Sequence, residues 1–128
     1  MRNKLGWAKE EIVVKRVKNS NGPGNVILAE IETESHTEVF SSFGGRDVPS
    51  GKVVEALVNQ VREFTTSDAP VGEYLADQLM IPLALAGGGS YRAIKASLHA
   101  RTNKDVIARF LGTGMRIEDS SSGSWFRC

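Results

Sequence analysis

Segments rich in β-branched residues recur in the first third of the chain, and one of them passes into the alternation of apolar and polar residues that is typical of a β-strand. Segment 26–33 opens with four apolar residues and then alternates Ile31 and Thr33 with glutamates, as expected for a strand with one face in water. Segments 11–18 and 36–43 are also rich in β-branched or aromatic residues, and 19–24 is a cluster of turn formers. We therefore predict three strands in an antiparallel meander.

The hydrophobic period changes to that of a helix after Pro49. Apolar residues recur at steps of three and four residues from Val53 to Phe64, which predicts a helix with one buried face. A second helix is predicted from 71 to 86, with Pro70 in its first turn. Pro82 removes a hydrogen bond inside this second helix, so we expect a kink or a break there.

Three glycines at 87–89 stop the second helix, and shorter elements follow. Residues 90–96 alternate like a strand. Thr102 or Asn103 can cap a short helix that carries the apolar residues of 106–111. Residues 115–118 are predicted as a last strand.

The order of these elements is strands, two helices, then strand, helix and strand. It predicts an α+β fold, a two-layer sandwich with a mixed or antiparallel sheet and helices packed on one face. We expect a single α/β module over residues 1–118. Residues 119–128 are predicted to be a polar, mobile linker and a C-terminal tail that carries Trp125 and Phe126.

Composition limits the class of protein more than its function. The 128 residues, 41% of them hydrophobic, suffice for one domain without a metal or disulfide staple, and the single cysteine is Cys128. A net charge of +1 gives no bulk attraction to phosphate. The longest apolar run, 79–86, is far short of the ~20 residues that cross a bilayer. We expect a cytoplasmic protein without membrane contact.

Spacing alone gives little support to catalytic or metal chemistry. His36 and His99 lie far apart and no Cys/His pair has zinc-ligand spacing, so no metal site is predicted. The glycines at 87–89 lack the lysine of a phosphate-binding loop and lie between a helix and a strand, which indicates a helix C-cap. Taken by spacing alone, His99 is more typical of a structural or exposed histidine than of a catalyst.

One face of the second helix stands out. Tyr74, Asp77 and Gln78 are spaced i, i+3 and i+4, so an aromatic, a carboxylate and an amide share this face. Such a set can stack a base and hydrogen-bond a ribose. The alternative is that Tyr74 is a half-buried core residue and that the two polar side chains are simply solvated.

Several segments resemble the C-terminal part of RNA 3′-terminal phosphate cyclase, over about residues 20–117. The resemblance rests on NGPGN (21–25), on PVGEYLADQL (70–79) continuing into IPLALAGGG (81–89), and on SLHARTN (97–103) followed by VIARFL (106–111). These motifs keep the family's order and spacing, and VGEYLADQL is the most specific of them. The resemblance implies the family's α/β fold.

The resemblance also implies roles for particular residues. His99 matches the histidine that becomes covalently adenylylated in these cyclases. The positions that match the lining of the adenosine pocket are Tyr74, Asp77 and Gln78. Either Phe40 or Phe43 corresponds to an aromatic that stacks on adenine, but the local sequence departs from the family pattern and does not say which.

The implied chemistry is the ATP-dependent conversion of an RNA 3′-phosphate to a 2′,3′-cyclic phosphate through a His99–AMP intermediate. ATP and Mg²⁺ are the implied cofactors, and an RNA 3′ end is the implied partner. The basic residues that could screen RNA phosphates are Arg46, Lys95 and Arg101. Solvated surface charge is the simpler interpretation of these three.

The resemblance does not extend to the family's larger N-terminal part, so we expect half of the active-site cleft to be missing. Two interpretations therefore stay open. The first is an incomplete or minimal cyclase that works alone, as a homo-oligomer, or with a partner that supplies the other half-site. The second is a non-catalytic nucleotide- or RNA-binding or assembly module that retains the cyclase fold.

Overall fold

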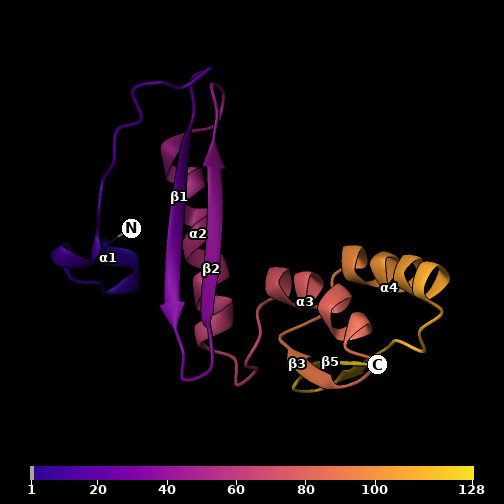
Figure 1. Cartoon of the computed structure of the whole chain (residues 1–128). Coiled ribbons are helices and arrows are strands. Elements are labelled where there is room, and N and C mark those ends of the chain that lie inside the picture. The colour runs from indigo at the N-terminus through magenta and orange to yellow at the C-terminus, as the bar shows by residue number, and fades with distance from the viewer. Residues whose placement is uncertain (1) are drawn as a thin grey trace. The chain divides into compact units, whose positions relative to one another are not determined.

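The computed structural model describes residues 2–128, which form two compact units, one up to Glu63 and one of Phe64–Cys128 (Figure 1). The predicted α+β class, with helices packed against antiparallel strands, is confirmed. The strands form two separate sheets, of two and three strands, rather than one. Among residues 2–128, no helix is both long enough and apolar enough to span a bilayer.

The N-terminal unit contains two strands and one long helix, preceded by short helical turns. Its elements are α1 (Arg2–Leu5), a 3₁₀ turn (Lys9–Glu11), β1 (Asn25–Glu32), β2 (Thr37–Gly44) and α2 (Ser50–Thr65). The antiparallel hairpin pairs Ala29 with Phe40, and both are buried on the face that α2 covers (Figure 1). Gln60 Nε2 of α2 donates to the Ser41 carbonyl at 3.3 Å. The predictions for 26–33, 36–43 and the first long helix are confirmed.

The predicted strand over 11–18 is wrong. Residues 12–17 lie outside any strand, and Val13, Val14 and Val17 are exposed. Branched side chains favour an extended backbone, but a strand also needs a neighbour to accept its hydrogen bonds. Within residues 2–128, β2 is the only neighbour of β1, so the predicted meander has two strands.

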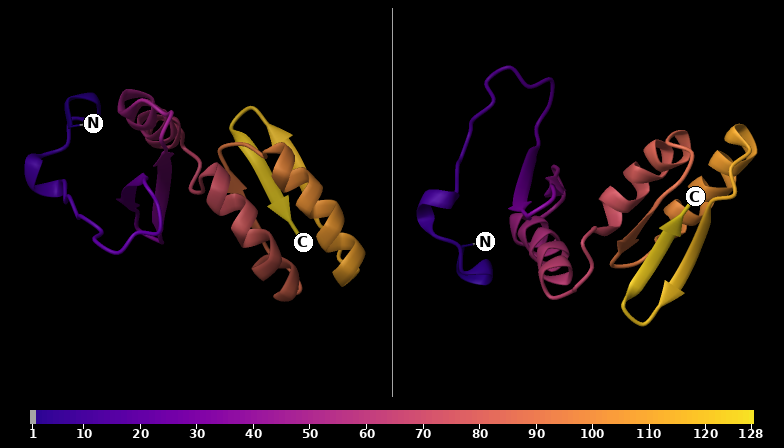
Figure 2. Two further views of the ribbon diagram at one scale, coloured as in Figure 1. Left: turned by 90° about the horizontal axis from the view of Figure 1, so that it is seen from above. Right: turned by 60° about the horizontal axis from the view of Figure 1, so that its bottom comes forward.

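The C-terminal unit is a two-layer arrangement of two helices on one face of a three-stranded sheet. Its elements are α3 (Glu73–Leu85), β3 (Ser90–Ala93), α4 (Leu98–Leu111), β4 (Arg116–Ser120) and β5 (Gly123–Arg127). The strand order is β3-β5-β4, all antiparallel, and Val71 adds a parallel bridge to Ala93. Figure 2 shows α3 and α4 side by side and running in the same direction.

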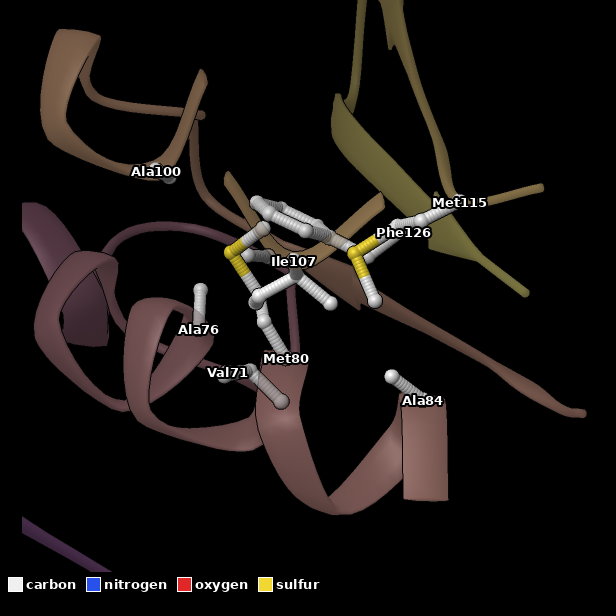
Figure 3. Close-up of a cluster of buried hydrophobic side chains, with 9 residues drawn as sticks. Val71, Ala76, Met80, Ala84, Ala100, Ile107, Met115 and Phe126 are labelled. Atoms are coloured by element: carbon white, nitrogen blue, oxygen red, sulfur yellow. The ribbon is translucent and has the colours of Figure 1, made fainter. Parts of the chain in front are cut away.

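The core of this unit gathers around Phe126, which is fully buried on the central strand β5. Met80 of α3, Ile107 of α4 and Met115 surround its ring (Figure 3). Tyr91 of β3 stacks on the same ring with centroids 4.8 Å apart. Residues from both helices and from the sheet therefore form one hydrophobic cluster, and this cluster sets the position of α3 relative to α4.

The predicted linker and tail over 119–128 are wrong, because these residues form a β-hairpin. β4 runs to Ser120, a two-residue turn follows, and β5 is the central strand of its sheet. The Ser and Gly residues that suggested mobility instead form the tight turn. Burial of Phe126 in the core stabilises the hairpin.

The start of α4 also differs from the prediction of a cap at Thr102 or Asn103. The helix begins at Leu98, and Ser97 is its N-cap, with the Ser97 Oγ accepting a hydrogen bond from the Ala100 N–H at 3.0 Å. Gly112 ends the helix in the left-handed conformation, with φ 63°. The earlier start has a functional consequence, because it places His99 in the first turn of a helix.

Pro82 does not break α3, which continues to Leu85. The proline lies in the last turn, so the missing N–H costs one hydrogen bond near the helix end, and the Ala86 N–H still donates to the Pro82 carbonyl at 2.9 Å. The glycines at 87–89 then end the helix, all three with positive φ.

Candidate functional site

The second turn of α3 and the first turn of α4 bring Asp77 and His99 together. His99 Nε2 lies 3.4 Å from Asp77 Oδ2, within ion-pair distance but too long for a strong hydrogen bond. The other carboxylate oxygen, Asp77 Oδ1, accepts a hydrogen bond from Asn103 Nδ2 at 2.7 Å. Two residues that lie far apart in the sequence thus form one cluster, which Asn103 completes.

Helix geometry accounts for this arrangement. His99 and Asn103 are four residues apart on α4, so they share the face that Asp77 approaches from α3. The Asp77 side chain is 21% exposed, whereas that of His99 is 76% exposed. The carboxylate is therefore held between the helices, and the imidazole stays open to a reactant.

The N-terminus of α4 adds positive potential next to this imidazole. The N–H groups in the first turn of a helix point along the axis, out of its N-terminal end, and attract anions. Ser97 Oγ satisfies the N–H of Ala100, and the Ser97 carbonyl accepts from the N–H of Arg101 at 3.1 Å. The remaining first-turn N–H groups lie beside His99, so a phosphate held by them would be close to the ring.

Tyr74 and Gln78 lie on the outer face of α3, beside Asp77. Tyr74 is 58% exposed, and Gln78 is exposed as well. The alternative in which Tyr74 is a half-buried core residue therefore does not describe this structure. The ring of Tyr74 is available for stacking, and the Gln78 amide is available for hydrogen bonds.

Tyr91 supports the cluster from beneath, and the sequence analysis missed this role. Its hydroxyl donates to the Ala76 carbonyl, next to Asp77 in α3. Burial raises the pKa of the Tyr91 phenol well above its usual range, and the negative charge of Asp77 raises this pKa further. The sequence predicts Asn103 only as a candidate helix cap, whereas the structure places it in the cluster. Its spacing of four residues from His99 was the available signal.

The two candidate stacking aromatics, Phe40 and Phe43, belong to the N-terminal unit. Phe40 is only 3% exposed and lies in the core on the α2 side of the hairpin. Phe43 is 72% exposed on the opposite face of β2. Of the two, only Phe43 presents an accessible ring.

The three basic residues considered for RNA differ in their surroundings. Lys95 Nζ lies 3.6 Å from Glu73 Oε2, and Arg101 holds both carboxylate oxygens of Asp119 at 2.9 and 2.7 Å. Arg46 is exposed in the turn after β2. Two of the three cations thus already have a carboxylate partner.

The described residues do not form a metal site. Among residues 2–128, no group of three or more His, Cys, Asp or Glu side chains is placed to hold an ion. The donor set near His99 consists of one carboxylate, one imidazole and one amide. The amide of this set is already hydrogen-bonded to the carboxylate.

Comparison with known proteins identifies the family. The family model for RNA 3′-terminal phosphate cyclase matches residues 4–117, and the chain belongs to this family. The chain is 42% identical over 120 residues to a protein from Koribacter versatilis (strain Ellin345) that is named RNA 3′-terminal phosphate cyclase. This match covers 94% of the chain and 34% of the relative.

Two further relatives carry the same name. The relative from Salmonella enteritidis PT4 is 42% identical over 102 residues, covering 80% of this chain and 30% of its own length. The one from Pseudomonas aeruginosa (strain UCBPP-PA14) is 38% identical over 121 residues, covering 94% and 35%. The chain therefore spans about a third of the length of these curated relatives.

Proposed function

We propose that this chain carries the nucleophile of an RNA 3′-terminal phosphate cyclase, and that His99 is the residue that receives AMP from ATP. The observation that carries the proposal is the exposed His99 imidazole, 3.4 Å from a carboxylate that a second residue holds in place. Membership of the cyclase family supports it.

The proposed first step is nucleophilic substitution at phosphorus. A neutral His99 nitrogen attacks the α-phosphorus of ATP, an N–P bond forms, and the bond to the leaving pyrophosphate breaks. The imidazole gains positive charge as the N–P bond forms, and the Asp77 carboxylate is close enough to stabilise that charge. The first-turn N–H groups of α4 would hold phosphate oxygens beside the ring.

The nucleotide would lie on the outer face of α3. Tyr74 is placed to stack on the adenine, and Gln78 to hydrogen-bond the nucleoside. Of the two phenylalanines that the resemblance implies for stacking, Phe40 is buried and Phe43 is exposed, so Phe43 is the remaining candidate. Mg²⁺ bound to the phosphates of ATP would reduce their charge.

Two transfers would complete the reaction. An oxygen of the RNA 3′-phosphate attacks the phosphorus of the His99-bound AMP, and the N–P bond breaks to release the imidazole. The neighbouring 2′-hydroxyl then attacks the activated 3′-phosphorus, loses its proton, and displaces AMP to close the 2′,3′-cyclic phosphate. RNA phosphates could be screened by Arg46, Lys95 and Arg101.

This chain matches about a third of each relative, so we expect the rest of a cyclase polypeptide to supply part of the catalytic machinery. Preorganised charge is usually the largest contribution to such reactions, and one carboxylate with one helix terminus provides little of it. We therefore expect slow adenylylation by this chain alone. The second candidate is a non-catalytic nucleotide- or RNA-binding or assembly module, favoured by the match to only about a third of each relative.

The test is incubation with α-labelled ATP and magnesium, followed by counting of protein-bound label. We expect faint label that His99→Ala abolishes. His36→Ala is the matched control, because His36 is the other histidine and contacts Ser35 Oγ and Glu38 in the β1–β2 hairpin. Absence of label above the His99→Ala level supports the second candidate. Label that survives His99→Ala excludes His99 as the nucleophile. Strong His99-dependent label contradicts the prediction that the site of this chain is incomplete.

A further inference from the structure

A short series of hydrogen bonds connects the β4–β5 hairpin to the start of α4. The Ser124 hydroxyl accepts a hydrogen bond from the Ala96 N–H at 2.9 Å and donates one to Asp119 Oδ1 at 2.7 Å. Arg101 of α4 donates to both carboxylate oxygens of Asp119, at 2.9 and 2.7 Å. We refer to Ser124 and Asp119 together as the hairpin anchor.

The Ser124 side of the hairpin anchor is closed to water. Ser124 is 3% exposed, and its hydroxyl both accepts and donates a hydrogen bond. An N–H that is shielded from water and loses its acceptor costs free energy, because no solvent molecule replaces the bond. Ala96 directly precedes Ser97, the N-cap of α4, so the hairpin fixes the point at which this helix begins.

The Asp119 side of the hairpin anchor is charged. Hydrogen bonds from Ser124 and from Arg101, together with the charge of Arg101, hold the pKa of the Asp119 carboxyl below its ordinary value of 3.8. Asp119 is therefore ionised at neutral pH and accepts from both partners. Because this ion pair is exposed, it contributes little to stability, and its main effect is on geometry.

The first turn of α4 is consequently held from two sides. Arg101 follows His99 by two residues, so the two side chains leave the helix about 200° apart. On the side of His99, Asn103 donates to Asp77 of α3 at 2.7 Å. On the opposite side, Arg101 is bonded to the hairpin. A helix bonded on one side only can roll about its axis, and a roll would move the imidazole relative to the Asp77 carboxylate.

The same end of the hairpin is bonded to the segment that leads into α3. Arg92 Nη1 of β3 donates to the Ser122 carbonyl in the hairpin turn at 2.9 Å, and Arg92 Nη2 donates to the Asp68 carbonyl at 2.7 Å. Asp68 lies five residues before the first residue of α3, the helix that carries Asp77. Both helices of the candidate site are thus tied, at their starts, to one end of one hairpin.

We propose that Ser124 and Asp119 are positioning residues for His99, which act by fixing the start of α4 against the hairpin. This inference rests on the proposed function, in which His99 is the nucleophile. A nucleophile misplaced by 1 Å can lose about 10²-fold in rate. Neither residue is among those proposed to bind the nucleotide, so their loss should lower the rate of adenylylation and leave the affinity for ATP. Both lie beyond residue 117, where the match to the family model ends.

The first experiment compares Ser124→Ala with Ser120→Ala in the full chain, by NMR of the two histidine rings without ATP. Ser120→Ala is the matched control, because the Ser120 hydroxyl donates to the Gly123 carbonyl inside the hairpin. The spectrum of His99→Ala identifies the ring signals of His99. Ser124→Ala should shift these signals and leave those of His36 unchanged, whereas Ser120→Ala should shift neither. The Ala96 amide should exchange with solvent at least about tenfold faster in Ser124→Ala.

A second pair of variants covers the case in which Ser124→Ala does not fold. Asp119 and Glu118 are exposed neighbours on β4, and successive side chains of a strand point to opposite faces. Glu118 accepts a hydrogen bond from Arg127 of β5 at 3.2 Å and has no bond to α4. Asp119→Ala should therefore shift the His99 signals, and Glu118→Ala should leave them in place.

The labelling assay separates positioning from nucleotide binding. At saturating ATP, Ser124→Ala and Asp119→Ala should each lower the rate of His99-dependent labelling about tenfold, while the half-saturating ATP concentration changes less than about twofold. Circular dichroism at the same temperature checks that the variants are folded. A raised half-saturating concentration with an unchanged rate would show that the two residues act on binding, and it would overturn the proposal.

Two results of the NMR experiment also overturn the proposal. One is that the His99 signals stay in place in both Ser124→Ala and Asp119→Ala, and the other is that Ser120→Ala and Glu118→Ala shift them as much. The NMR experiment needs no activity. Shifted His99 signals without label in the unchanged chain contradict only the proposed function, and His99-dependent label that neither anchor variant slows contradicts only the positioning role.

Discussion

Asn103 determines the orientation of the carboxylate beside the candidate nucleophile. Its amide donates to Asp77 Oδ1 at 2.7 Å, which leaves Oδ2 directed at His99. A hydrogen bond to a charged group contributes about 1.5–3 kcal/mol where it is shielded from water. This bond is part-buried, so its contribution to stability belongs at the lower end of that range.

Asn103→Ala should therefore lower the free energy of unfolding by about 1.5 kcal/mol and reduce ATP-dependent labelling of His99 about tenfold, because Asp77 loses its fixed orientation. Urea denaturation and the labelling assay measure the two effects. Thr102→Ala is the control, since the Thr102 hydroxyl donates only to the Leu98 carbonyl of its own helix. Unchanged labelling in Asn103→Ala would remove Asn103 from the site.

Tyr91 makes stability depend on pH in the alkaline range. Its phenol has an ordinary pKa of 10.0, and burial, assisted by the charge of Asp77, raises the pKa in the folded state. The unfolded chain therefore loses this proton at a lower pH than the folded one. The contribution of the Tyr91 phenol to the free energy of unfolding is fully present below pH 10, and it is lost as pH rises from 10 toward the folded-state pKa.

We expect the free energy of unfolding to fall above pH 10 with a slope of up to about 1.4 kcal/mol per pH unit from this group. Chemical denaturation at pH 9, 10 and 11 measures the slope. Tyr91→Phe should flatten it, whereas Tyr74→Phe should not, because the Tyr74 ring is exposed. Equal slopes in the two variants would show that Tyr91 is not the responsible group.

At the scale of elements, the β4–β5 hairpin depends on Gly123. This glycine has φ 122°, and a Cβ there would collide with the backbone carbonyl oxygen of Ala93 in β3. β5 is the central strand and carries Phe126, so displacement of β5 would open the core of the C-terminal unit.

Gly123→Ala should consequently destabilise the C-terminal unit by about 3 kcal/mol or more, through strain and lost strand pairing. The readout is urea denaturation followed by the fluorescence of Trp125 on β5. Gly114→Ala provides the comparison, because a Cβ at Gly114 meets no atom within 4 Å. A Gly123→Ala protein as stable as Gly114→Ala would contradict this account of the hairpin.

Elements with a long, consistent period were predictable. α2 presents six apolar residues at helical steps, and the β1 and β2 segments are rich in β-branched and aromatic residues. The segment 11–18 has strand composition but no neighbour, and the start of α4 depends on Ser97, whose capping role requires the chain to turn there. The composition of a segment does not show whether a neighbouring strand will pair with it or where the chain will turn to cap a helix.

At the scale of the whole molecule, the proposed function implies that the region outside the matched third largely sets the rate. His99, Asp77 and the α4 terminus form a site that is open on the side of solvent. Removal of a single preorganised donor from an active site typically costs about 10²–10³ in rate. A site without the larger part of its charged groups should lose at least as much.

A mixture of this chain with a polypeptide that contains the unmatched part of the Koribacter versatilis relative should therefore label His99 at least ~100-fold faster than the chain alone. His99→Ala should abolish label in either preparation. Initial rates with α-labelled ATP distinguish the cases. Equal rates with and without the second polypeptide would show that the chain's own residues suffice for its chemistry.

The sequence by itself determined the α+β class, the first long helix, the hairpin that precedes it, and the motifs that indicate the cyclase family, because period and motif are local properties of a chain. Only the tertiary structure decided that Asp77 lies against His99, that Asn103 holds it, and that Phe40 is buried while Phe43 is exposed. It also decided that Phe126 is the centre of a core rather than part of a tail. Each of these features depends on contacts between segments that lie far apart in the sequence, and such contacts form only when the whole unit folds.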